Sequence, residues 1–333
     1  MGGCGRGGKE TGDPIRAPSR AKVRQGLDMP IKIPDTLPAR TTLEAEGVVV
    51  MRETDAARQD IRPLKLGLLN LMPDKPRTET QFARLLGAVP LQVELSLVHM
   101  GSHTPRHTSA DHMAAFYRTW DDVRQETFDG FLVTGAPVET LPFEQVGYWD
   151  ELRRLFDWTQ RHVHSTMTIC WGAQAALQHF HGVPKHELDA KLSGVFSHRV
   201  EAPASPYLRG FSDDVDIPVS RWTEVRRADL PGEDKVRVLL DSDEAGIGLV
   251  EDLERRLLFM FNHLEYEAGT LAAEYARDSA KDPSTPVPAH YFPGDDPSRA
   301  PRNRWRGHAH LFFSNWINEI YQTTPYHLDE IGR

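Results

Sequence analysis

The sequence predicts an α/β domain with an open, doubly wound and mostly parallel sheet. From Leu64 onward, short apolar runs alternate with amphipathic helical stretches, which is the pattern of successive βαβ units. Some of these runs, such as 131–134, are almost continuously apolar, as is typical of parallel strands covered by helices on both faces. A chain of 333 residues with 39% hydrophobic residues is also long enough to bury a full core.

The first 63 residues differ in composition from the rest. Residues 1–28 are rich in Gly, Pro, Arg and Lys and show no apolar period, so we expect a disordered leader without catalytic residues. Residues 29–63 begin with the proline-punctuated run "MPIKIPDTLPAR" and are predicted to form an extended N-terminal arm. Residues 64–333 then form the main domain.

The first half of the main domain is the more regular half. Each predicted helix there follows a predicted strand, and Gly182 is placed to close the last helix. The strands are expected at 64–70, 91–98, 128–136 and 164–170, and the helices at 79–89, 148–163 and 171–181.

The second half is less regular. A proline-rich stretch, 281–305, separates its two predicted helices and is long enough to act as a lid or a subunit contact. We therefore expect the sheet to be followed by an irregular C-terminal helical extension. The strands are expected at 191–200, 236–241, 246–252 and 255–263, and the helices at 268–282 and 308–322.

Composition excludes several classes of partner. With 39 Lys and Arg against 48 Asp and Glu, the net charge of -9 argues against binding to nucleic acid or an anionic membrane. No window reaches the 18 or so uninterrupted apolar residues of a membrane span, and no apolar run near the start suits a signal peptide. The two cysteines, Cys4 and Cys170, cannot form a disulfide framework. We therefore expect a cytoplasmic protein.

Cys170 is predicted to lie in the tight turn between the strand 164–170 and the helix that begins at Trp171. This position is at the carboxyl edge of a parallel sheet, where ligands bind in such folds. A nucleophile elbow has the same arrangement, although only Gly172 of its usual glycines is present and Thr168 takes the place of the other. The helix N-terminus would favour a thiolate and could hold an oxyanion. The alternative is that Cys170 is a small buried hydrophobic residue.

A nucleophilic cysteine needs a base and a group that orients the base. Of the 15 histidines, His263 stands just past an apolar strand, with Glu265 two residues later on the expected same face. The alternative is an exposed polar pair at a strand end. Other histidine pairs lack a cysteine or carboxylate at familiar metal-ligand spacing, so we expect no metal; these are His162 with His164, His179 with His181, and His308 with His310.

Several segments together resemble the homoserine O-acyltransferase family of methionine biosynthesis. They occur in the same order as in the family, and the resemblance covers nearly everything from Met29 onward. The resemblance implies a flavodoxin-like α/β fold similar to class I glutamine amidotransferases, a Cys-His-Glu triad and a homodimer. The segments are "LGLLNLMPDKPRTETQFARLL", "VTGAPVETLPFEQVGYWDEL", "ICWGAQAAL", "KLSGVFSHRV", "HLEYEAGTLAAEYARD" and "WRGHAHLFFSNWINEIYQTTPY".

The resemblance assigns roles residue by residue. Cys170 matches the acyl-accepting nucleophile, His263 the proton acceptor and Glu265 the third member of the triad. The positions that match homoserine contacts are Lys191, Ser220 and Arg277, and the expected oxyanion donors, by analogy of fold, are the backbone amides of Trp171 and of the turn at Gly135.

The implied reaction is a ping-pong transfer through an acyl-cysteine. Acyl-CoA is a co-substrate, and no further cofactor is expected. Glu139 stands where acetyl-using relatives have Glu and succinyl-using relatives have Gly, so the resemblance implies acetyl-CoA as the donor. The alternative for Glu139 is a solvent-facing residue that caps the next turn. Lys75 is expected to approach the site.

Three other functions stay open from the sequence. The first is homoserine O-succinyltransfer by the same residues. The second is a glutaminase-type amidotransferase, although the usual elbow has Gly where this chain has Thr168, and no synthetase domain accompanies it. The third is a non-catalytic binding protein in which Cys170 is only a redox-sensitive thiol.

Overall fold

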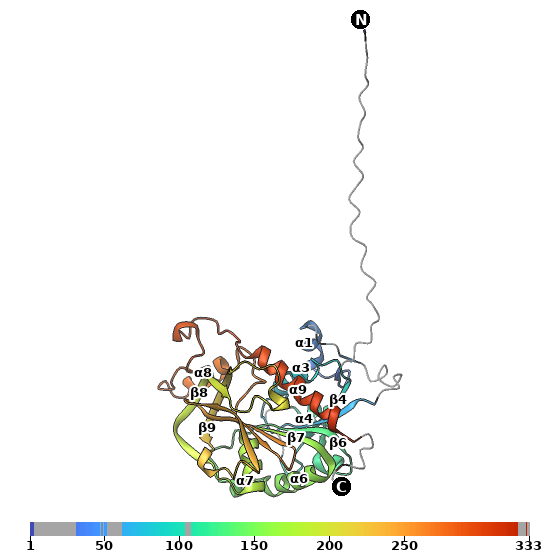
Figure 1. Cartoon of the computed structure of the whole chain (residues 1–333), viewed down its shortest axis with the longest axis vertical. Coiled ribbons are helices and arrows are strands. Elements are labelled where there is room, and N and C mark those ends of the chain that lie inside the picture. Colours follow the sequence, from blue (N-terminus) through green and yellow to red (C-terminus); the bar gives the residue numbers. More distant parts are fainter. Residues whose placement is uncertain are drawn as a thin grey trace.

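A computed structural model describes residues 1–2, 31–46, 48, 50–51, 62–103, 108–325 and 331. Apart from its first two residues, the predicted leader at 1–28 lies outside this part of the chain. One sheet runs through the molecule (Figure 1). Its strands, in spatial order, are β2 (Val50–Met51), β1 (Ile31–Lys32), β4 (Val93–His99), β3 (Leu64–Leu69), β6 (Phe128–Val133), β7 (Val163–Ile169), β12 (Leu257–Met260), β11 (Gly246–Asp252), β10 (Val236–Ser242), β8 (His186–Val200) and β9 (Asp214–Glu224), with β5 (Tyr117–Thr119) paired to β4.

The sheet changes character at β12. All pairs from β2 to β12 are parallel, including β7 with β12, whereas the pairs from β12 through β11, β10 and β8 to β9 are antiparallel. The prediction of a doubly wound, mostly parallel sheet is therefore confirmed. The sequence pattern did not predict β9, the strand at the antiparallel edge.

Helices cover both faces of the parallel strands. In Figure 1, α6 (Trp149–His162) and α7 (Trp171–His181) lie on one face, and α3 (Lys75–Leu86) and α9 (Arg306–Thr323) lie on the other. Alternate residues of β6 serve the two layers, because Phe131 and Val133 pack with α6 and α7 while Leu132 packs with α3 and α9. This double burial explains the apolar run at 131–133 in the second half of β6.

Two helix boundaries follow from capping. The helix predicted at 79–89 begins earlier, at Lys75, because the Asp74 side chain accepts a hydrogen bond from the Arg77 amide at 3.3 Å and starts the helix there. The helix α7 ends as predicted, with Gly182 in the left-handed conformation at φ 68°.

The predicted N-terminal arm at 29–63 is extended only in part, which corrects the sequence prediction. Within its described residues, β1 joins the sheet beside β4, and a helix, α1 (Ala39–Ala45), packs on α3. The helix forms because Ala39 and Leu43, one turn apart, share a buried face.

The polar stretch between β4 and β6 holds α4 (Ala110–Phe116) and α5 (Trp120–Val123), and α8 (Thr270–Ser279) follows β12. Short 3₁₀ helices complete the described elements: Phe143–Gln145, Pro206–Leu208, Arg227–Asp229 and Pro293–Asp295.

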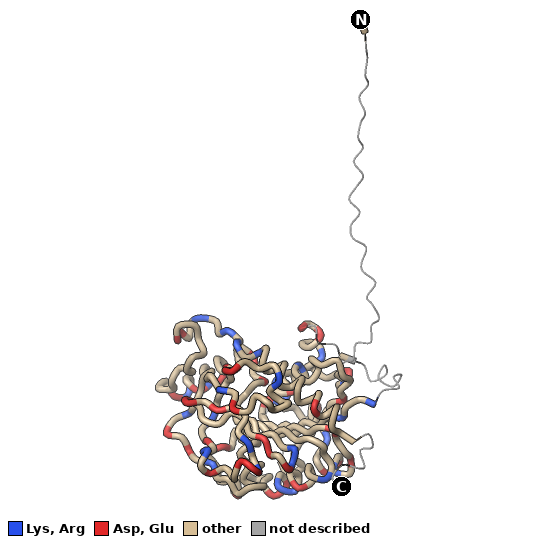
Figure 2. The backbone as a smooth tube through the Cα atoms, viewed as in Figure 1, with Lys and Arg blue, Asp and Glu red and all other residues tan. Residues whose placement is uncertain are grey.

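Charges of both signs alternate along the backbone in Figure 2, and neither sign gathers on one side. Among the described residues, no helix has the length and apolar character needed to cross a membrane.

Candidate active site

A cavity of about 400 Å³ lies beside the carboxyl ends of β6 and β7, where the parallel and antiparallel strands meet. This is the edge at which ligands bind in open α/β sheets. The cavity brings together residues from positions 72 to 277, including seven that the sequence singled out: Gly135, Glu139, Cys170, Lys191, Ser220, His263 and Arg277.

Cys170 occupies a strained elbow. Its backbone adopts φ 53° and ψ -120°, which is a sparsely populated conformation for a residue with a side chain, and the first turn of α7 follows at once. Such a conformation costs about 1–3 kcal/mol and persists only where the surroundings hold it. Here the Cys170 amide donates to Met260 O at 2.7 Å. The elbow predicted from the sequence is therefore present.

The elbow tolerates threonine at one glycine position and requires glycine at the other. The Thr168 hydroxyl donates to Leu258 O at 3.1 Å across the β7–β12 pair, so its side chain has a place in the sheet. A Cβ at Gly172, in contrast, would lie 2.6 Å from Thr134 O. Only glycine lets α7 approach the end of β6 so closely.

Two backbone segments border the sulfur. A Cβ at Gly135 would lie 3.1 Å from Cys170 Cβ and 3.6 Å from its Sγ, so the turn after β6 is in contact with the nucleophile. Trp171 is the first residue of α7, and its amide has no acceptor within the helix by position. The Trp171 side chain is buried in the core and does not line the cavity, so only its main chain can take part.

His263 and Glu265 form a buried pair. Glu265 Oε1 lies 2.6 Å from His263 Nδ1. The predicted pairing is thus present, but its predicted cause was wrong: β12 ends at Met260, and the two residues lie in the turn that follows it. The His263 amide donates to Pro218 O at 2.9 Å, which fixes the turn against β9.

The surroundings of His263 favour the imidazolium. Burial lowers its pKa, but the negative charges of Glu265 and Cys170 and the hydrogen bonds with them outweigh burial, so the pKa stands well above its ordinary value. His263 thus links Cys170 to Glu265, an arrangement that is compatible with the predicted Cys-His-Glu triad.

Glu274 on α8 is a site residue that the sequence did not reveal. One oxygen accepts from Ser220 Oγ at 2.5 Å and lies 3.3 Å from Lys191 Nζ, while the other accepts from the Tyr266 hydroxyl at 2.8 Å. Burial raises its pKa, but Lys191 and the two hydroxyl donors outweigh burial, and the pKa is lowered. The only available hint was its place three residues before Arg277, on the same helix face.

Asp278 holds the two cations that the sequence assigned to homoserine. Lys191 Nζ lies 2.9 Å from its carboxylate, and Arg277 donates to it through Nε at 2.7 Å and Nη2 at 3.0 Å. These hydrogen bonds lower the pKa of Asp278 to about 2, with Arg277 the largest cause. One edge of the half-exposed guanidinium is thus occupied, and the edge at Nη1 is left for another carboxylate.

Glu139 turns into the cavity and does not cap the next turn. Its Oε2 accepts from the Trp222 amide of β9 at 2.7 Å. Burial raises its pKa, against the smaller opposing effects of the Trp222 amide, His263 and Lys191. A carboxyl group therefore forms part of the wall of the cavity that contains Cys170.

Lys75 supports the site from behind and does not line the cavity. Its buried Nζ donates to Asn70 O at 2.6 Å and lies 3.5 Å from Met72 O, and Met72 is the residue that reaches the cavity. Burial lowers its pKa to about 8.

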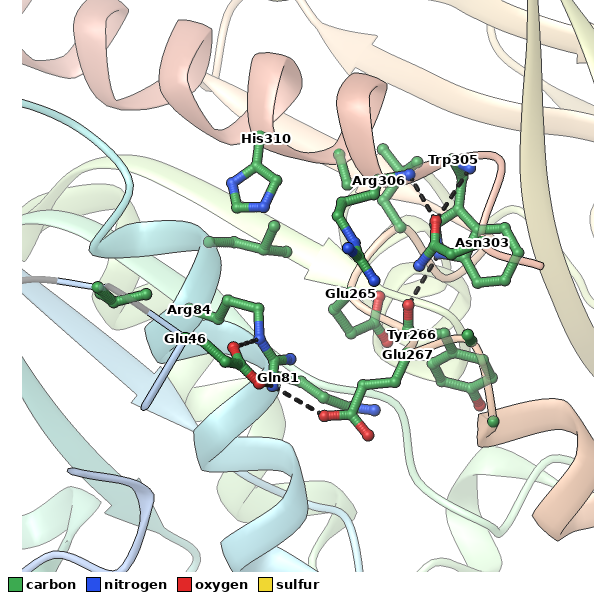
Figure 3. Close-up of a pocket in the computed structure, with 16 residues that line it drawn as sticks. Glu46, Gln81, Arg84, Glu265, Tyr266, Glu267, Asn303, Trp305, Arg306 and His310 are labelled. Carbon is green, nitrogen blue, oxygen red and sulfur yellow. Dashed lines mark hydrogen bonds and ion pairs between the residues drawn. The ribbon is translucent and has the colours of Figure 1, made fainter. Parts of the chain in front are cut away.

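A second, larger cavity of about 580 Å³ lies on the far side of Tyr266 (Figure 3). It reaches Glu265 but neither Cys170 nor His263, and its central Arg84 is paired with Glu46 and Glu267. It therefore has no nucleophile, and the smaller cavity is the candidate active site. Among the described residues, no group of three or more His, Cys, Asp or Glu side chains is placed to hold a metal ion.

The sequence of the chain is similar to those of several known proteins. Residues 30–326 match the family model described as homoserine O-succinyltransferase. A homoserine O-acetyltransferase from Rhizorhabdus wittichii is 68% identical over 304 residues, which cover 91% of this chain and 95% of that protein. Another from Brucella canis is 64% identical over 305 residues, which cover 92% of this chain and all of that protein.

Solved structures match the fold at much lower identity. A glutamine amidotransferase from Thermotoga maritima is 9% identical with a TM-score of 0.52, covering 79% of this chain and 100% of that one. A putative GMP synthase subunit from Thermoplasma acidophilum is 13% identical with a TM-score of 0.51, covering 79% and 96%. At these identities the likeness concerns the fold alone, and it agrees with the amidotransferase-like core expected from the sequence.

Proposed function

The chain belongs to the homoserine O-succinyltransferase family and is a homoserine O-acyltransferase; from this premise we propose that it transfers an acetyl group from acetyl-CoA to the γ-hydroxyl of L-homoserine. The observation that carries the choice of acetyl is the carboxyl group of Glu139 in the wall of the Cys170 cavity.

In the first half-reaction, the thiolate of Cys170 attacks the carbonyl carbon of the acetyl-CoA thioester. The oxyanion of the tetrahedral intermediate is held by the main-chain amides of Trp171 and of the turn at Gly135. The C–S bond to CoA then breaks, the CoA sulfur takes a proton from the His263 imidazolium, and the acetyl group remains on Cys170 as a new thioester. Glu265 supports this step because it stabilises the imidazolium through Nδ1.

In the second half-reaction, the γ-hydroxyl of homoserine attacks the acetyl-cysteine. His263 takes the hydroxyl proton, the C–S bond to Cys170 breaks, and O-acetylhomoserine leaves with the thiolate restored. The free edge of Arg277 suits the α-carboxylate, since a guanidinium binds carboxylates in a bidentate manner. The α-ammonium fits the carboxylate of Glu274, between Lys191 and Ser220.

Glu139 discriminates against a succinyl donor through charge and size. A succinyl group ends in a carboxylate, and two negative charges about 4 Å apart repel by about 4 kcal/mol at an effective dielectric constant near 20. Protonation of Glu139 would relieve this repulsion but costs free energy when the pH is above the pKa of the carboxyl group. The longer succinyl chain would still collide with the Glu139 side chain. We therefore expect a preference for acetyl-CoA of up to about three decades in kcat/KM.

The test compares acetyl-CoA and succinyl-CoA as donors for the native enzyme, Glu139→Gly and Glu139→Gln. The native enzyme should prefer acetyl-CoA, and the Gly variant should gain succinyl-CoA use. The Gln variant separates the two causes, because it removes the charge and retains the size. A native enzyme that prefers succinyl-CoA would show that Glu139 does not set the donor, and would leave the succinyltransferase alternative.

The resemblance to the family also supports a homodimer that works in the cytoplasm, without a metal or a resident cofactor. Sedimentation equilibrium of the purified chain tests the dimer. Activity after exhaustive treatment with a chelator tests independence from metal.

A further inference from the structure

Tyr266 stands between the base and the acceptor residues and is not assigned by the sequence motifs. Its ring stacks on His263, with the ring centroids 4.2 Å apart and the planes inclined by 17°. The side chain is almost fully buried, so the stack shields one face of the imidazole from water. An imidazole covered in this way can turn only if the tyrosine also moves.

The hydroxyl of the same side chain reaches the acceptor residues. It donates to Glu274 Oε1 at 2.8 Å, and the other oxygen of Glu274 is held by Ser220 and Lys191. Burial and the nearby charges of Glu274, Glu265 and Cys170 raise the pKa of this phenol well above its ordinary value, so it remains a donor at any working pH.

The backbone of Tyr266 is held from both sides. Its amide donates to His263 O at 3.3 Å, and its carbonyl accepts from Trp305 Nε1 at 2.8 Å (Figure 3). The ring therefore rests on a rigid turn that also contains His263 and Glu265.

We infer that Tyr266 is a positioning residue that couples the acceptor site to the base: its ring sets the plane of His263, and its hydroxyl sets the carboxylate of Glu274. The inference rests on the proposed function, in which Glu274 receives the ammonium of homoserine. One side chain thereby aligns the bound acceptor with the nitrogen that takes its proton. The ring acts in both half-reactions, whereas the hydroxyl acts in the second alone.

Tyr266→Phe tests this division, because it retains the ring and removes the hydroxyl. The burst of CoA released from acetyl-CoA without homoserine should stay within about twofold of the native rate, since the ring still covers His263. The KM for homoserine should rise about 10- to 100-fold, as expected when a donor to a buried carboxylate is lost. Tyr266→Leu removes the ring as well and should slow the burst itself.

Tyr291→Phe is the matched control. The Tyr291 hydroxyl also binds near the start of α8, since it donates to Ala268 O and accepts from the Ala272 amide at 3.1 Å, but it does not line the active-site cavity. This variant should lower the melting temperature and leave the KM for homoserine within about twofold.

The outcomes separate the inference from its premise. An unchanged KM in Tyr266→Phe, or an equal rise in Tyr291→Phe, overturns the inference and leaves the proposed function standing. A slower burst in Tyr266→Phe overturns the division between ring and hydroxyl. A native enzyme that releases no CoA until homoserine is added overturns the covalent mechanism, and the inference with it.

Discussion

The parallel half of the sheet, from β2 to β12, and the antiparallel half, from β11 to β9, contribute different parts of one cavity. The parallel half supplies Cys170 at the end of β7, the turn at Gly135 after β6, and His263 after β12, which are the nucleophile, oxyanion site and base of the proposed function. The antiparallel half supplies Lys191 from β8 and Ser220 from β9. Under the proposed function, acyl chemistry belongs to the parallel half, and acceptor recognition belongs to Lys191 and Ser220 of the antiparallel half together with α8, whose Glu274 contacts both.

The two halves are bound together at the site by contacts that cross between them. Glu139 of the parallel half accepts from the Trp222 amide of β9, and Gln174 of α7 exchanges hydrogen bonds with Thr223 at 2.8 and 3.1 Å. These contacts fix the distance between nucleophile and acceptor. For the proposed ping-pong reaction, this arrangement means that the residues that bind one substrate can be changed without changing the residues that bind the other.

The largest expected effect comes from the parallel half. Cys170→Ala should lower kcat by at least about 10⁴-fold, since Cys170 is the only thiol among the residues that line the cavity. Mass spectrometry after incubation with acetyl-CoA should show one added acetyl group on the native peptide that contains Cys170 and none on the variant peptide.

Cys170→Ser is the matched variant. It should retain the fold and lose most of the activity, because a hydroxyl is far less ionised than a thiol at neutral pH. Full activity of Cys170→Ala would contradict the mechanism, and an acetyl group on another peptide would identify a different nucleophile.

The difference between the halves also explains what the sequence could predict. The strands β3, β4, β6 and β7 are mostly buried and rich in apolar or β-branched residues, so they were predicted close to their observed bounds. The strand β9 was missed because it contains Pro218, which cannot donate a ladder hydrogen bond, and polar residues such as Asp214, Asp216 and Ser220.

The residues of the candidate site also differ in how far the sequence could predict them. Local features sufficed for Cys170, since a strand, a turn and a helix follow one another around it. Lys191, Ser220 and Arg277 were reached only through the family resemblance, because each is a common surface residue by pattern. Glu274 was missed entirely, since its partners at Ser220 and Lys191 lie 54 and 83 positions away.

The free energy of unfolding, measured at acid pH, should test whether both halves of the sheet lose stability over the same pH range. His198 of the antiparallel half and His164 of the parallel half both have their pKa lowered to about 4, chiefly by burial and then by a neighbouring arginine in the case of His164. The unfolded chain therefore binds protons at these sites below about pH 6.5 that the folded chain does not bind until about pH 4. The contribution of these two sites to the free energy of unfolding is full above pH 6.5 and falls as the pH drops through this window, by about 3 kcal/mol for the deeply buried His198 and by less for His164, which is more open to solvent screening.

His198→Gln and His164→Gln should each flatten part of that fall, measured by urea unfolding at pH 7, 5.5 and 4.5. His198 is held as a neutral acceptor because Asn262 Nδ2 donates to its Nε2 at 2.7 Å, and a glutamine oxygen can accept in its place. Flattening by only one variant would show that acid weakens one half first. Parallel curves for both variants and the native enzyme would exclude the two histidines as the cause.

The smallest expected effect concerns the acceptor alone. Arg277→Ala should raise the KM for homoserine about 10- to 100-fold, the range expected for a hydrogen-bonded charge pair. The burst of CoA without homoserine should be unchanged, because Cys170, His263 and the turn at Gly135 are untouched. Asp278→Asn is the control, since it loosens the clamp on the Arg277 guanidinium without removing the guanidinium. This control should alter the KM by less than Arg277→Ala. If Arg277→Ala instead slows the burst and leaves the KM as it is, the acceptor side of the cavity also takes part in the reaction with acetyl-CoA, and the proposed division does not hold.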